Sequence, residues 1–180
     1  MMRSCSSVWS GRMTTVIAAR NIFITGLPGG GKTTLIKELA HEPREFGPVG
    51  FFTEEIREHG SRKGFKLTTH DETETGVLAP VDIRGPYPVG KYIVNLGGFE
   101  QFLEFLRLPG PSARLIIFDE IGNRECLSGK FRGRVLSLLD TPVPVSATIA
   151  LKGHRSSSSA ACAIIEPKAG PGSQGLFIPV

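Results

Sequence analysis

The sequence predicts an α/β fold with a mostly parallel, twisted sheet that is flanked by helices. Short apolar runs rich in β-branched residues alternate along the chain with segments whose apolar residues recur at helical spacing. Strands that alternate with helices are typical of parallel sheets with right-handed connections. A length of 180 residues, of which 40% are hydrophobic and 21% charged, fits one globular domain with a buried core. No apolar run approaches the roughly 20 residues of a membrane-spanning helix, so a protein of that class is excluded.

The expected strands and helices follow one another from residue 21 onward. A strand over residues 21–25 precedes a helix over residues 34–40, in which apolar residues recur on one face. A second strand over residues 49–56 is followed by a turn and by an alternating segment over residues 65–69, which predicts a small β-hairpin. The remaining expectations are a loop over residues 70–90, strands over 91–95, 114–119 and 143–150, and helices over 99–106 and 131–139.

The two ends of the chain differ in composition from the middle. Residues 1–20 are rich in serine and arginine and lack acids, so we expect a disordered leader outside the fold. The same composition is typical of mitochondrial transit peptides, which leaves import as an alternative to a cytoplasmic location. Residues 154–180 contain a serine run and are then dominated by alanine, glycine and proline, so we expect a loosely ordered tail in which only 163–165 could form a strand. The folded domain is therefore expected over residues 21–153.

Charge and cysteine content exclude two further classes. The net charge is +4, but residues 1–37 hold five basic side chains and no acid, so the remaining chain is nearly neutral. A basic face for nucleic acid is therefore not indicated. The three cysteines, Cys5, Cys126 and Cys162, are scattered, which indicates neither a disulfide framework nor a zinc site and favours a reducing compartment.

A glycine-rich segment between the first strand and the first helix fits the phosphate-binding P-loop pattern GxxxxGK[ST] in full. Its backbone N–H groups can approach phosphate oxygens closely, and the N-terminus of the following helix favours anions. In such a loop, Lys32 reaches the β- and γ-phosphates and the Thr33 hydroxyl ligates Mg²⁺. The residues expected to bind the nucleotide are Gly26, Leu27, Pro28, Gly29, Gly30, Gly31, Lys32, Thr33 and Thr34.

An acidic pair stands where the strand over residues 114–119 ends. A P-loop enzyme needs an acid at such a position to hold Mg²⁺ directly or through water, and Asp119 has it. Glu120 follows at once, and in a hydrolase a carboxylate there can orient the attacking water or accept its proton. An exposed acidic turn is the other interpretation of the pair.

Phosphoryl transfer also needs positive charge near the γ-phosphate, and the residues alone do not choose its source. Glu54 and Glu55 lie on opposite faces of the second strand, so one of them could reach the same edge of the sheet. The four histidines have no metal-ligand spacing and are expected at the surface. The candidate arginines are Arg57, Arg62, Arg124, Arg132 and Arg155.

Several motifs together resemble the cancer-related nucleoside-triphosphatase family. They are the P-loop, Gly50-Phe-Phe-Thr-Glu-Glu-Ile-Arg57, Arg62-Lys-Gly-Phe65, Val89-Gly-Lys-Tyr-Ile-Val94, and Asp119-Glu-Ile-Gly122 with Glu125, in the family's order over residues 21–153. The resemblance implies a P-loop domain that hydrolyses ATP, GTP and other nucleoside triphosphates to diphosphate and phosphate, with broad base selectivity and a requirement for Mg²⁺. After Gly153 the sequence departs from the family, which continues with a helix, a strand and a final helix where this chain has its serine-rich tail. We therefore expect a missing edge strand, which would expose part of the sheet.

From the residues and the resemblance together we expect a Mg²⁺-dependent hydrolase of nucleoside triphosphates. Glu120, Lys32 and Arg57 are its expected catalytic residues, and Thr33 and Asp119 its expected metal ligands. A nucleoside or nucleotide kinase and a non-catalytic nucleotide-binding protein are the alternatives. The expected partners are nucleoside triphosphates, with no membrane, no nucleic acid and a monomeric state.

Overall fold

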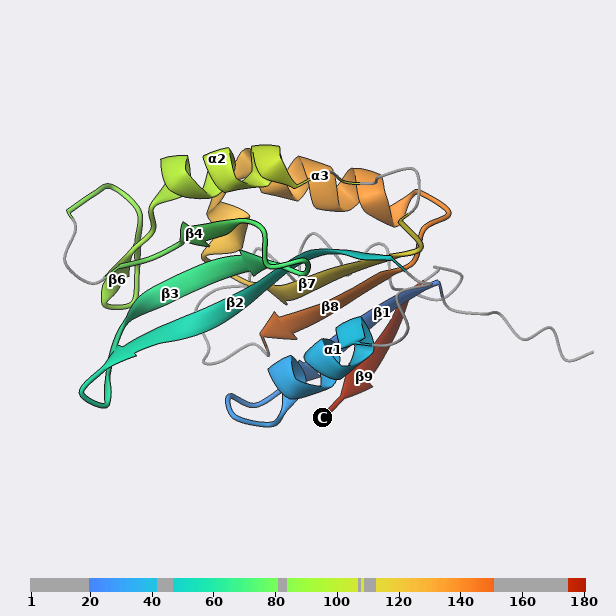
Figure 1. The fold of residues 1–180 in the computed structure, drawn as a ribbon, viewed down its shortest axis with the longest axis horizontal. Coiled ribbons are helices and arrows are strands. Elements are labelled where there is room, and N and C mark those ends of the chain that lie inside the picture. The colour runs from blue at the N-terminus through green and yellow to red at the C-terminus, as the bar shows by residue number, and fades with distance from the viewer. Residues whose placement is uncertain (1–19, 42–46, 81–83, 107, 109–112, 151–174) are drawn as a thin grey trace, which may run out of the picture.

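The middle layer of the fold is a seven-stranded sheet (Figure 1). The computed structural model describes residues 20–41, 47–80, 84–106, 108, 113–150 and 175–180. The strands of this sheet are β1 (Asn21–Gly26), β2 (Pro48–Glu58), β3 (Ser61–Thr69), β4 (Thr75–Val77), β7 (Leu115–Ile121), β8 (Val145–Ala150) and β9 (Gly175–Pro179). They lie in the order β4-β3-β2-β7-β8-β1-β9.

Most neighbouring strands of the sheet are parallel. The pairs β2–β7, β7–β8, β8–β1 and β1–β9 are parallel, whereas β3 pairs antiparallel with both β2 and β4. Both the mostly parallel sheet and the hairpin after the second strand are therefore confirmed. The hairpin turns at His59 and Gly60, which have positive φ angles of 47° and 77°. Its two strands extend closer to this turn than the sequence predicts.

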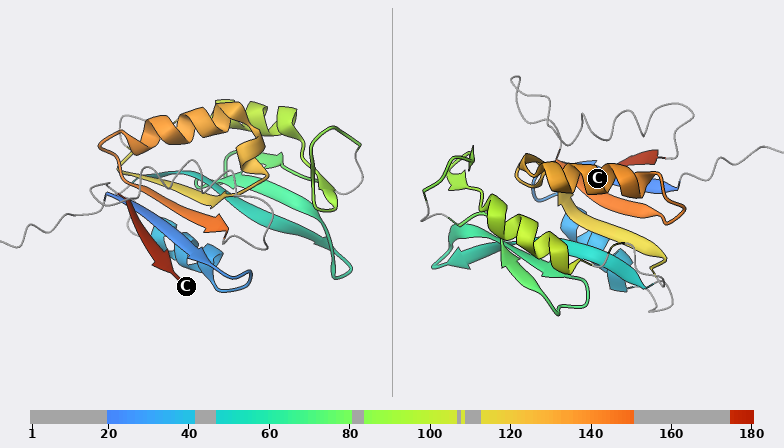
Figure 2. Two further views of the ribbon diagram at one scale, coloured as in Figure 1. Left: turned by 180° about the vertical axis from the view of Figure 1, so that it is seen from behind. Right: turned by 90° about the horizontal axis from the view of Figure 1, so that it is seen from above.

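Helices cover both faces of the sheet. Helix α1 (Lys32–His41) lies on one face, and α2 (Leu96–Phe105) and α3 (Gly129–Leu139) lie on the other, as Figure 1 and Figure 2 show. The Asn95 side chain accepts a hydrogen bond from the Gly98 N–H, and the Ser128 hydroxyl accepts one from the Phe131 N–H, each at 3.1 Å. Such caps satisfy free amides of a first helical turn, and they explain why α2 and α3 begin earlier than their apolar residues alone predict.

The larger core lies between the sheet and the pair α2 and α3. Phe51 is fully buried there, and its ring lies 5.3 to 6.1 Å from the rings of four other phenylalanines. Burying one such side chain contributes about 1.5–3 kcal/mol. A smaller core of Ile24, Ile36 and Ile117 lies under α1. Both cores fix β1 and β7, the strands whose ends carry the residues described below. The partners of Phe51 are Phe99, Phe102, Phe118 and Phe131.

The C-terminal region differs from the sequence expectation. Residues 175–179 form β9, the outer strand beside β1. For this segment, the predictions of a loosely ordered tail and of a missing edge strand are therefore wrong. Pro179 is tolerated because an edge strand has one row of unpaired backbone groups, where a missing N–H breaks no ladder. Residues 1–19 of the leader expected over 1–20, and residues 151–174 with the predicted strand at 163–165, lie outside the described part of the chain.

The segment expected as a loop over residues 70–90 holds more structure than predicted. It contains β4 and also β5 (Pro88–Val89), which pairs with β6 (Tyr92–Ile93) in a separate two-stranded sheet. The predicted strand over 91–95 is thus present only as β6, outside the main sheet. Within the described residues, no helix is both long enough and apolar enough to cross a membrane. The expected cytoplasmic location and monomeric state stay predictions.

Candidate functional site

A cavity of about 470 Å³ lies at the edge of the sheet where the parallel strands β1 and β7 end. This is the edge at which α/β sheets bind ligands. Its walls come from the loop between β1 and α1, from the β2–β3 hairpin, and from the end of β7 with the residues that follow. The described lining residues are Gly26, Pro28, Gly29, Gly31, Lys32, Thr33, Thr34, Thr53, Glu55, Arg62, Phe65, Asp119, Glu120 and Arg124.

The loop after β1 has the geometry that a phosphate-binding loop requires. Gly29 and Gly31 have φ angles of 80° and 86°, a backbone region that residues with a side chain rarely adopt. Gly30 N–H donates to the Leu27 carbonyl at 3.1 Å, which closes the turn. Helix α1 then begins at Lys32, so its free N-terminal amides lie at the cavity. Leu27 and Gly30 belong to the loop but are not among the lining residues.

Gly26, the first residue of the P-loop pattern, is closely packed against the edge strand. A Cβ atom at this position would lie 2.2 Å from the carbonyl oxygen of Val180. The Val180 N–H donates to the Thr25 carbonyl at 2.8 Å, which fixes this approach. The absence of a side chain at Gly26 is therefore required by a neighbouring backbone, a relationship that the sequence pattern did not reveal.

The Lys32 ammonium bends back over its own loop. Its Nζ donates to the carbonyl oxygens of Gly26 and Leu27, each at 3.0 Å. Neutral carbonyls are weaker partners for an ammonium than phosphate oxygens. An anion that enters the loop can therefore replace them.

Asp119 is buried at the end of β7. The Thr148 hydroxyl, on the neighbouring strand β8, donates to Asp119 Oδ1 at 2.5 Å. Burial raises the pKa of Asp119, and the hydroxyls of Thr148 and Thr33 and the nearby lysine charges act in the opposite direction. Oδ2 is buried and has no hydrogen-bond partner among the described residues. Thr148 was not identified as a site residue from the sequence. Its only signal there was that it is a polar residue within an apolar strand.

The donor atoms at this point fit a magnesium ion bound with a nucleotide. Mg²⁺ prefers oxygen ligands and usually takes one or two from the protein, with phosphates and water supplying the rest. The free Oδ2 of Asp119 and the hydroxyl of Thr33 are such oxygens, and both residues line the cavity. Among the described residues, no group of three His, Cys, Asp or Glu side chains could hold a metal ion by itself.

A second, coupled set of charges surrounds Glu120. Burial raises the pKa of Glu120, the charge of Asp119 raises it further, and Arg124 lowers it. Arg124 Nη2 lies 3.7 Å from Glu120 Oε1. Glu125 is fully buried beside this pair, and the Gly122 N–H donates to its Oε2 at 3.1 Å. Burial and the charge of Glu120 raise the pKa of Glu125 to about 7.

Two arginines, not the expected one, lie in the cavity. Arg62 and Arg124 line it and lie on Phe65, with 5.5 and 3.7 Å from each guanidinium carbon to the ring centre. Arg57 is not among the described lining residues: it stands near the hairpin turn, beyond a shift in the β2–β3 register, and 57% of its side chain is exposed. The role proposed from the sequence for Arg57 therefore lacks support from its position.

The remaining acidic and basic candidates are also separated by the fold. Glu54 and Glu55 lie on opposite faces of β2, as alternation predicts: Glu54 pairs with Lys37 of α1 at 2.5 Å, and Glu55 lines the cavity. Arg132 donates to the Cys126 carbonyl at 2.5 Å, which gives it a structural partner. Arg155 lies outside the described residues.

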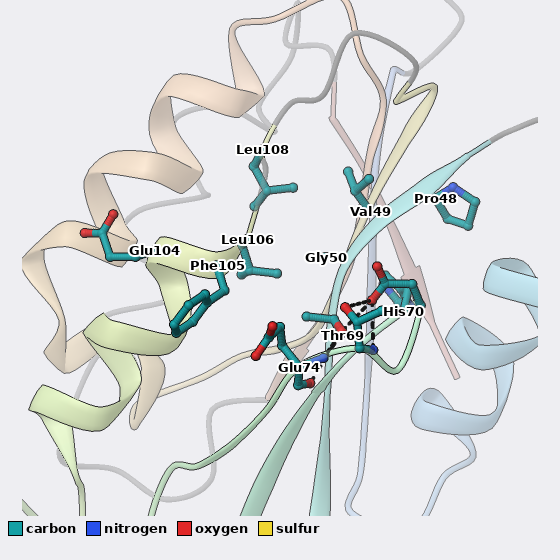
Figure 3. Close-up of a pocket in the computed structure, with 12 residues that line it drawn as sticks. Pro48, Val49, Gly50, Thr69, His70, Glu74, Glu104, Phe105, Leu106 and Leu108 are labelled. Carbon is teal, nitrogen blue, oxygen red and sulfur yellow. Dashed lines mark hydrogen bonds between the residues drawn. The ribbon is translucent and has the colours of Figure 1, made fainter.

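A second cavity, of about 590 Å³, lies at the opposite end of β2 (Figure 3). None of its described lining residues is lysine or arginine, and Glu74 and Glu104 are among them, so it would repel a triphosphate. His70, also in its wall, is not the surface residue expected from the sequence. Burial lowers the pKa of His70 to about 4, while its Nε2 lies 3.2 Å from the Ile117 carbonyl.

Comparisons with known proteins point to the same chemistry. A family model described as NTPase matches residues 21–168. The nucleoside-triphosphatase THEP1 of Thermotoga sp. (strain RQ2) is 50% identical over 129 residues, which are 71% of this chain and 72% of that protein. The human cancer-related nucleoside-triphosphatase is 42% identical over 136 residues, which are 69% of this chain and 71% of that protein.

Solved structures match over a longer span. The solution structure of a human cancer-related nucleoside triphosphatase aligns with a TM-score of 0.71 at 34% identity, over 90% of this chain and 89% of that one. The crystal structure of THEP1 from the hyperthermophile Aquifex aeolicus aligns with a TM-score of 0.69 at 32% identity, over 88% of each chain.

Proposed function

This chain belongs to the NTPase family, and on that premise we propose that it catalyses the Mg²⁺-dependent hydrolysis of nucleoside 5′-triphosphates to diphosphates and phosphate. The resemblance to the cancer-related nucleoside-triphosphatases and the P-loop α/β fold are confirmed by the same matches. The observation that carries the proposal is one cavity that brings the P-loop, Lys32 and the acidic pair Asp119 and Glu120 together.

The P-loop and Lys32 bind the phosphates in this proposal. The amides of Gly29 and of residues 31–33, which line the cavity, donate to phosphate oxygens at the N-terminus of α1. Lys32 exchanges two carbonyl partners at 3.0 Å for oxygens of the β- and γ-phosphates. A charge-assisted hydrogen bond is about twice as strong as a neutral one, so the exchange favours the bound nucleotide.

Thr33 and Asp119 would hold Mg²⁺. The hydroxyl of Thr33 and the free Oδ2 of Asp119 supply the oxygens, and Thr148 keeps the Asp119 carboxylate in place through Oδ1. The ion, when bound, neutralises charge on the phosphate oxygens. Burial of Asp119 in the absence of a cation disfavours its charged form, which is consistent with a site built to receive one.

Glu120 orients the attacking water and accepts its proton. Its side chain is 24% exposed at the cavity, so water can reach it. Arg124 favours the ionised carboxylate, the form that a base must have. Burial and the neighbouring Asp119 act against ionisation and so raise its affinity for a proton.

Broad base selectivity is part of the proposal. The described lining residues offer hydroxyl, ammonium, guanidinium and backbone groups that suit phosphates, and none is asparagine or glutamine, the amides best suited to a base edge. We therefore expect ATP, GTP, CTP and UTP to be hydrolysed at rates within about tenfold of one another, since a missing apolar or weak polar contact changes a rate by about that factor.

The test is phosphate release from each of the four nucleotides with Mg²⁺ and no added acceptor. Release that is lost in Lys32→Ala and in Glu120→Gln, but kept in the exposed control Glu38→Gln, supports the proposal. A kinase would instead release no phosphate and would consume ATP only when a nucleoside or nucleotide acceptor is added. A non-catalytic binding protein would bind nucleotide with no turnover in any variant.

A further inference from the structure

Arg62 reaches the cavity with an unused hydrogen-bond donor. It stands at the start of β3 and lines the cavity together with Lys32 and Glu120. Its Nε is buried without a hydrogen-bond partner among the described residues, while its Nη2 contacts Glu55 Oε1. A buried, unpartnered donor is unfavourable unless a ligand satisfies it. The guanidinium is therefore only partly satisfied by the protein.

Glu55 is an unusual residue for a cavity that receives a triphosphate. A carboxylate there repels phosphate oxygens unless cations neutralise it. Two arginines do so: Arg62 contacts Oε1, and Arg57 contacts Oε2 through Nε at 2.9 Å and Nη2 at 2.5 Å. If one arginine leaves, the other still neutralises the carboxylate.

Arg124 also has a buried Nε without a hydrogen-bond partner among the described residues, but its ion pairs are with Glu120 and Glu125 and not with Glu55. It lies 3.7 Å from Glu120 Oε1 and 3.9 Å from Glu125 Oε1, and its guanidinium carbon is 3.7 Å from the centre of the Phe65 ring. Moving it would take its positive charge away from both carboxylates. Arg62 is farther from the same ring, at 5.5 Å, and interacts with Glu55 and Tyr92. Among the described residues Glu55 is its one ion-pair partner, and Glu55 also pairs with Arg57.

On the basis of the hydrolysis proposed above, we propose that Arg62 is the catalytic arginine that contacts the γ-phosphate, and that Glu55 is a positioning residue that holds Arg62 until a triphosphate competes for it. Arg57 stays with Glu55 and neutralises it after Arg62 moves. This assigns Arg57 a place in the machinery that differs from the catalytic one predicted from the sequence.

The chemical step balances without a change in the protonation of Arg62. A bond forms between the water oxygen and the γ-phosphorus, and the bond from that phosphorus to the β–γ bridging oxygen breaks with its electron pair on the diphosphate. The water proton passes to Glu120. Arg62 donates hydrogen bonds to oxygens on which charge accumulates in the transition state, so its effect falls mainly on kcat.

The test separates kcat, KM and nucleotide affinity in matched variants. Arg62→Ala is expected to lower kcat by about 10³-fold, the lower end of the effect of a transition-state arginine, and to weaken binding of a fluorescent nucleotide by less than about tenfold. Arg62→Lys, which keeps the charge but not the planar fork, is expected to lower kcat by at least about tenfold. Arg114→Ala removes an exposed arginine at the opposite edge of the sheet and is expected to match the wild type.

A double-mutant cycle tests the role of Glu55. Glu55→Gln removes the competitor for Arg62, so KM is expected to fall by about three- to tenfold in the wild-type background and to be unchanged in the Arg62→Ala background. Thermal unfolding and circular dichroism are recorded for every variant, and a variant that does not fold is replaced by its conservative form, Arg62→Lys or Glu55→Asp.

The outcomes distinguish the two proposals. If Lys32→Ala and Glu120→Gln lose activity while both Arg62 variants keep the wild-type kcat, the role of Arg62 is wrong and the hydrolase stands. If Glu55→Gln lowers KM equally with and without Arg62, Glu55 acts by simple repulsion and its positioning role is wrong. If Lys32→Ala and Glu120→Gln keep the wild-type rate, the proposed function itself fails.

Discussion

The Thr148 hydroxyl donates a 2.5 Å hydrogen bond to the carboxylate of Asp119, across the parallel strands β7 and β8. This contact leaves one oxygen of a buried acid satisfied and the other free to bind a ligand. It also depends on the sheet order, since β8 lies between β1 and β7 and brings Thr148 beside the acid. The position of the expected metal ligand is thus set by a residue on a neighbouring strand.

Replacing Thr148 tests this relationship. Thr148→Val removes the hydroxyl at nearly constant volume, and we expect it to lower the free energy of unfolding by about 1–3 kcal/mol because a buried acceptor loses its donor. It should also raise the Mg²⁺ concentration needed for half-maximal activity, because burial then raises the pKa of Asp119 without this opposing contact. Urea unfolding and a Mg²⁺ titration measure the two effects. Thr148→Ser keeps the hydroxyl, so a Ser variant as impaired as the Val variant would contradict the assignment.

The parts of the site that the sequence predicted are those whose residues stand together in one short segment. The P-loop and the pair Asp119 and Glu120 are local patterns at strand ends, and strand ends meet at one edge of a parallel sheet. Arg57 was favoured because it stands in a family-like segment, but in the folded hairpin it lies near the turn, exposed and outside the described cavity lining. No local pattern shows which residues of the hairpin will face the cavity.

Other features depend on which strands become neighbours. Thr148 reaches Asp119 only because β8 lies beside β7, and Arg62 lines the cavity because the β2–β3 hairpin forms part of its wall. Strand β9 was missed because a five-residue apolar run within a segment of glycine, alanine and proline carries a weak signal. Its partner β1 lies more than 150 residues earlier in the chain. Residues 175–179 are a strand because they pair with β1, and a local sequence pattern does not show that pairing.

Glu125 predicts a fall in stability as the pH rises. Burial and the charge of Glu120 raise the pKa of Glu125 from 4.5 to about 7, so between these values the native state holds a proton that the unfolded chain has released. The free energy of unfolding therefore falls across this interval by about 3 kcal/mol at most. Glu125→Gln removes the pH dependence that Glu125 gives to the free energy of unfolding. We therefore expect the stability of this variant, relative to the wild type, to be higher at pH 8 than at pH 5. Equal differences at the two pH values would show that Glu125 does not titrate in this way.

His70 predicts the opposite dependence at lower pH. Burial lowers the pKa of His70 from 6.5 to about 4, because Nδ1 is buried with no partner among the described residues and cannot easily take a proton. The stability that this neutral ring provides is present above pH 6.5 and is lost as the pH falls toward 4, by about 3 kcal/mol at most.

The comparison variant for this effect is His70→Gln, which can still donate to the Ile117 carbonyl but does not titrate. Denaturant unfolding is measured for the wild type and the variant from pH 7.5 to 4.5. The free energy of unfolding should fall more steeply in the wild type, because His70 takes up a proton near pH 6.5 in the unfolded chain but not in the native state. His59→Gln, at the exposed hairpin turn, serves as the control and should follow the wild type. Parallel curves for wild type and His70→Gln would be incompatible with a buried neutral ring.

Gly26 and Val180 predict that the edge strand and the phosphate loop are coupled. A Cβ at Gly26 would lie 2.2 Å from the Val180 carbonyl, so we expect Gly26→Ala to lower the free energy of unfolding by about 1–3 kcal/mol, the range for overpacked sites. Gly133→Ala provides the contrast, since a Cβ atom at this position of α3 would meet nothing within 4 Å and alanine favours a helix by about 1 kcal/mol.

The coupling is measured by repeating Gly26→Ala in a chain shortened to residue 174, which lacks β9. In the shortened chain the Val180 carbonyl is absent, so a Cβ at position 26 no longer meets it. The decrease in the free energy of unfolding caused by Gly26→Ala should then be a fraction of its value in the full chain. Nucleotide affinity should follow the same pattern, because the displaced backbone belongs to the loop that binds the phosphates. An unchanged loss in the shortened chain would mean that Gly26 is required by the loop itself and that β9 packs there without influencing it.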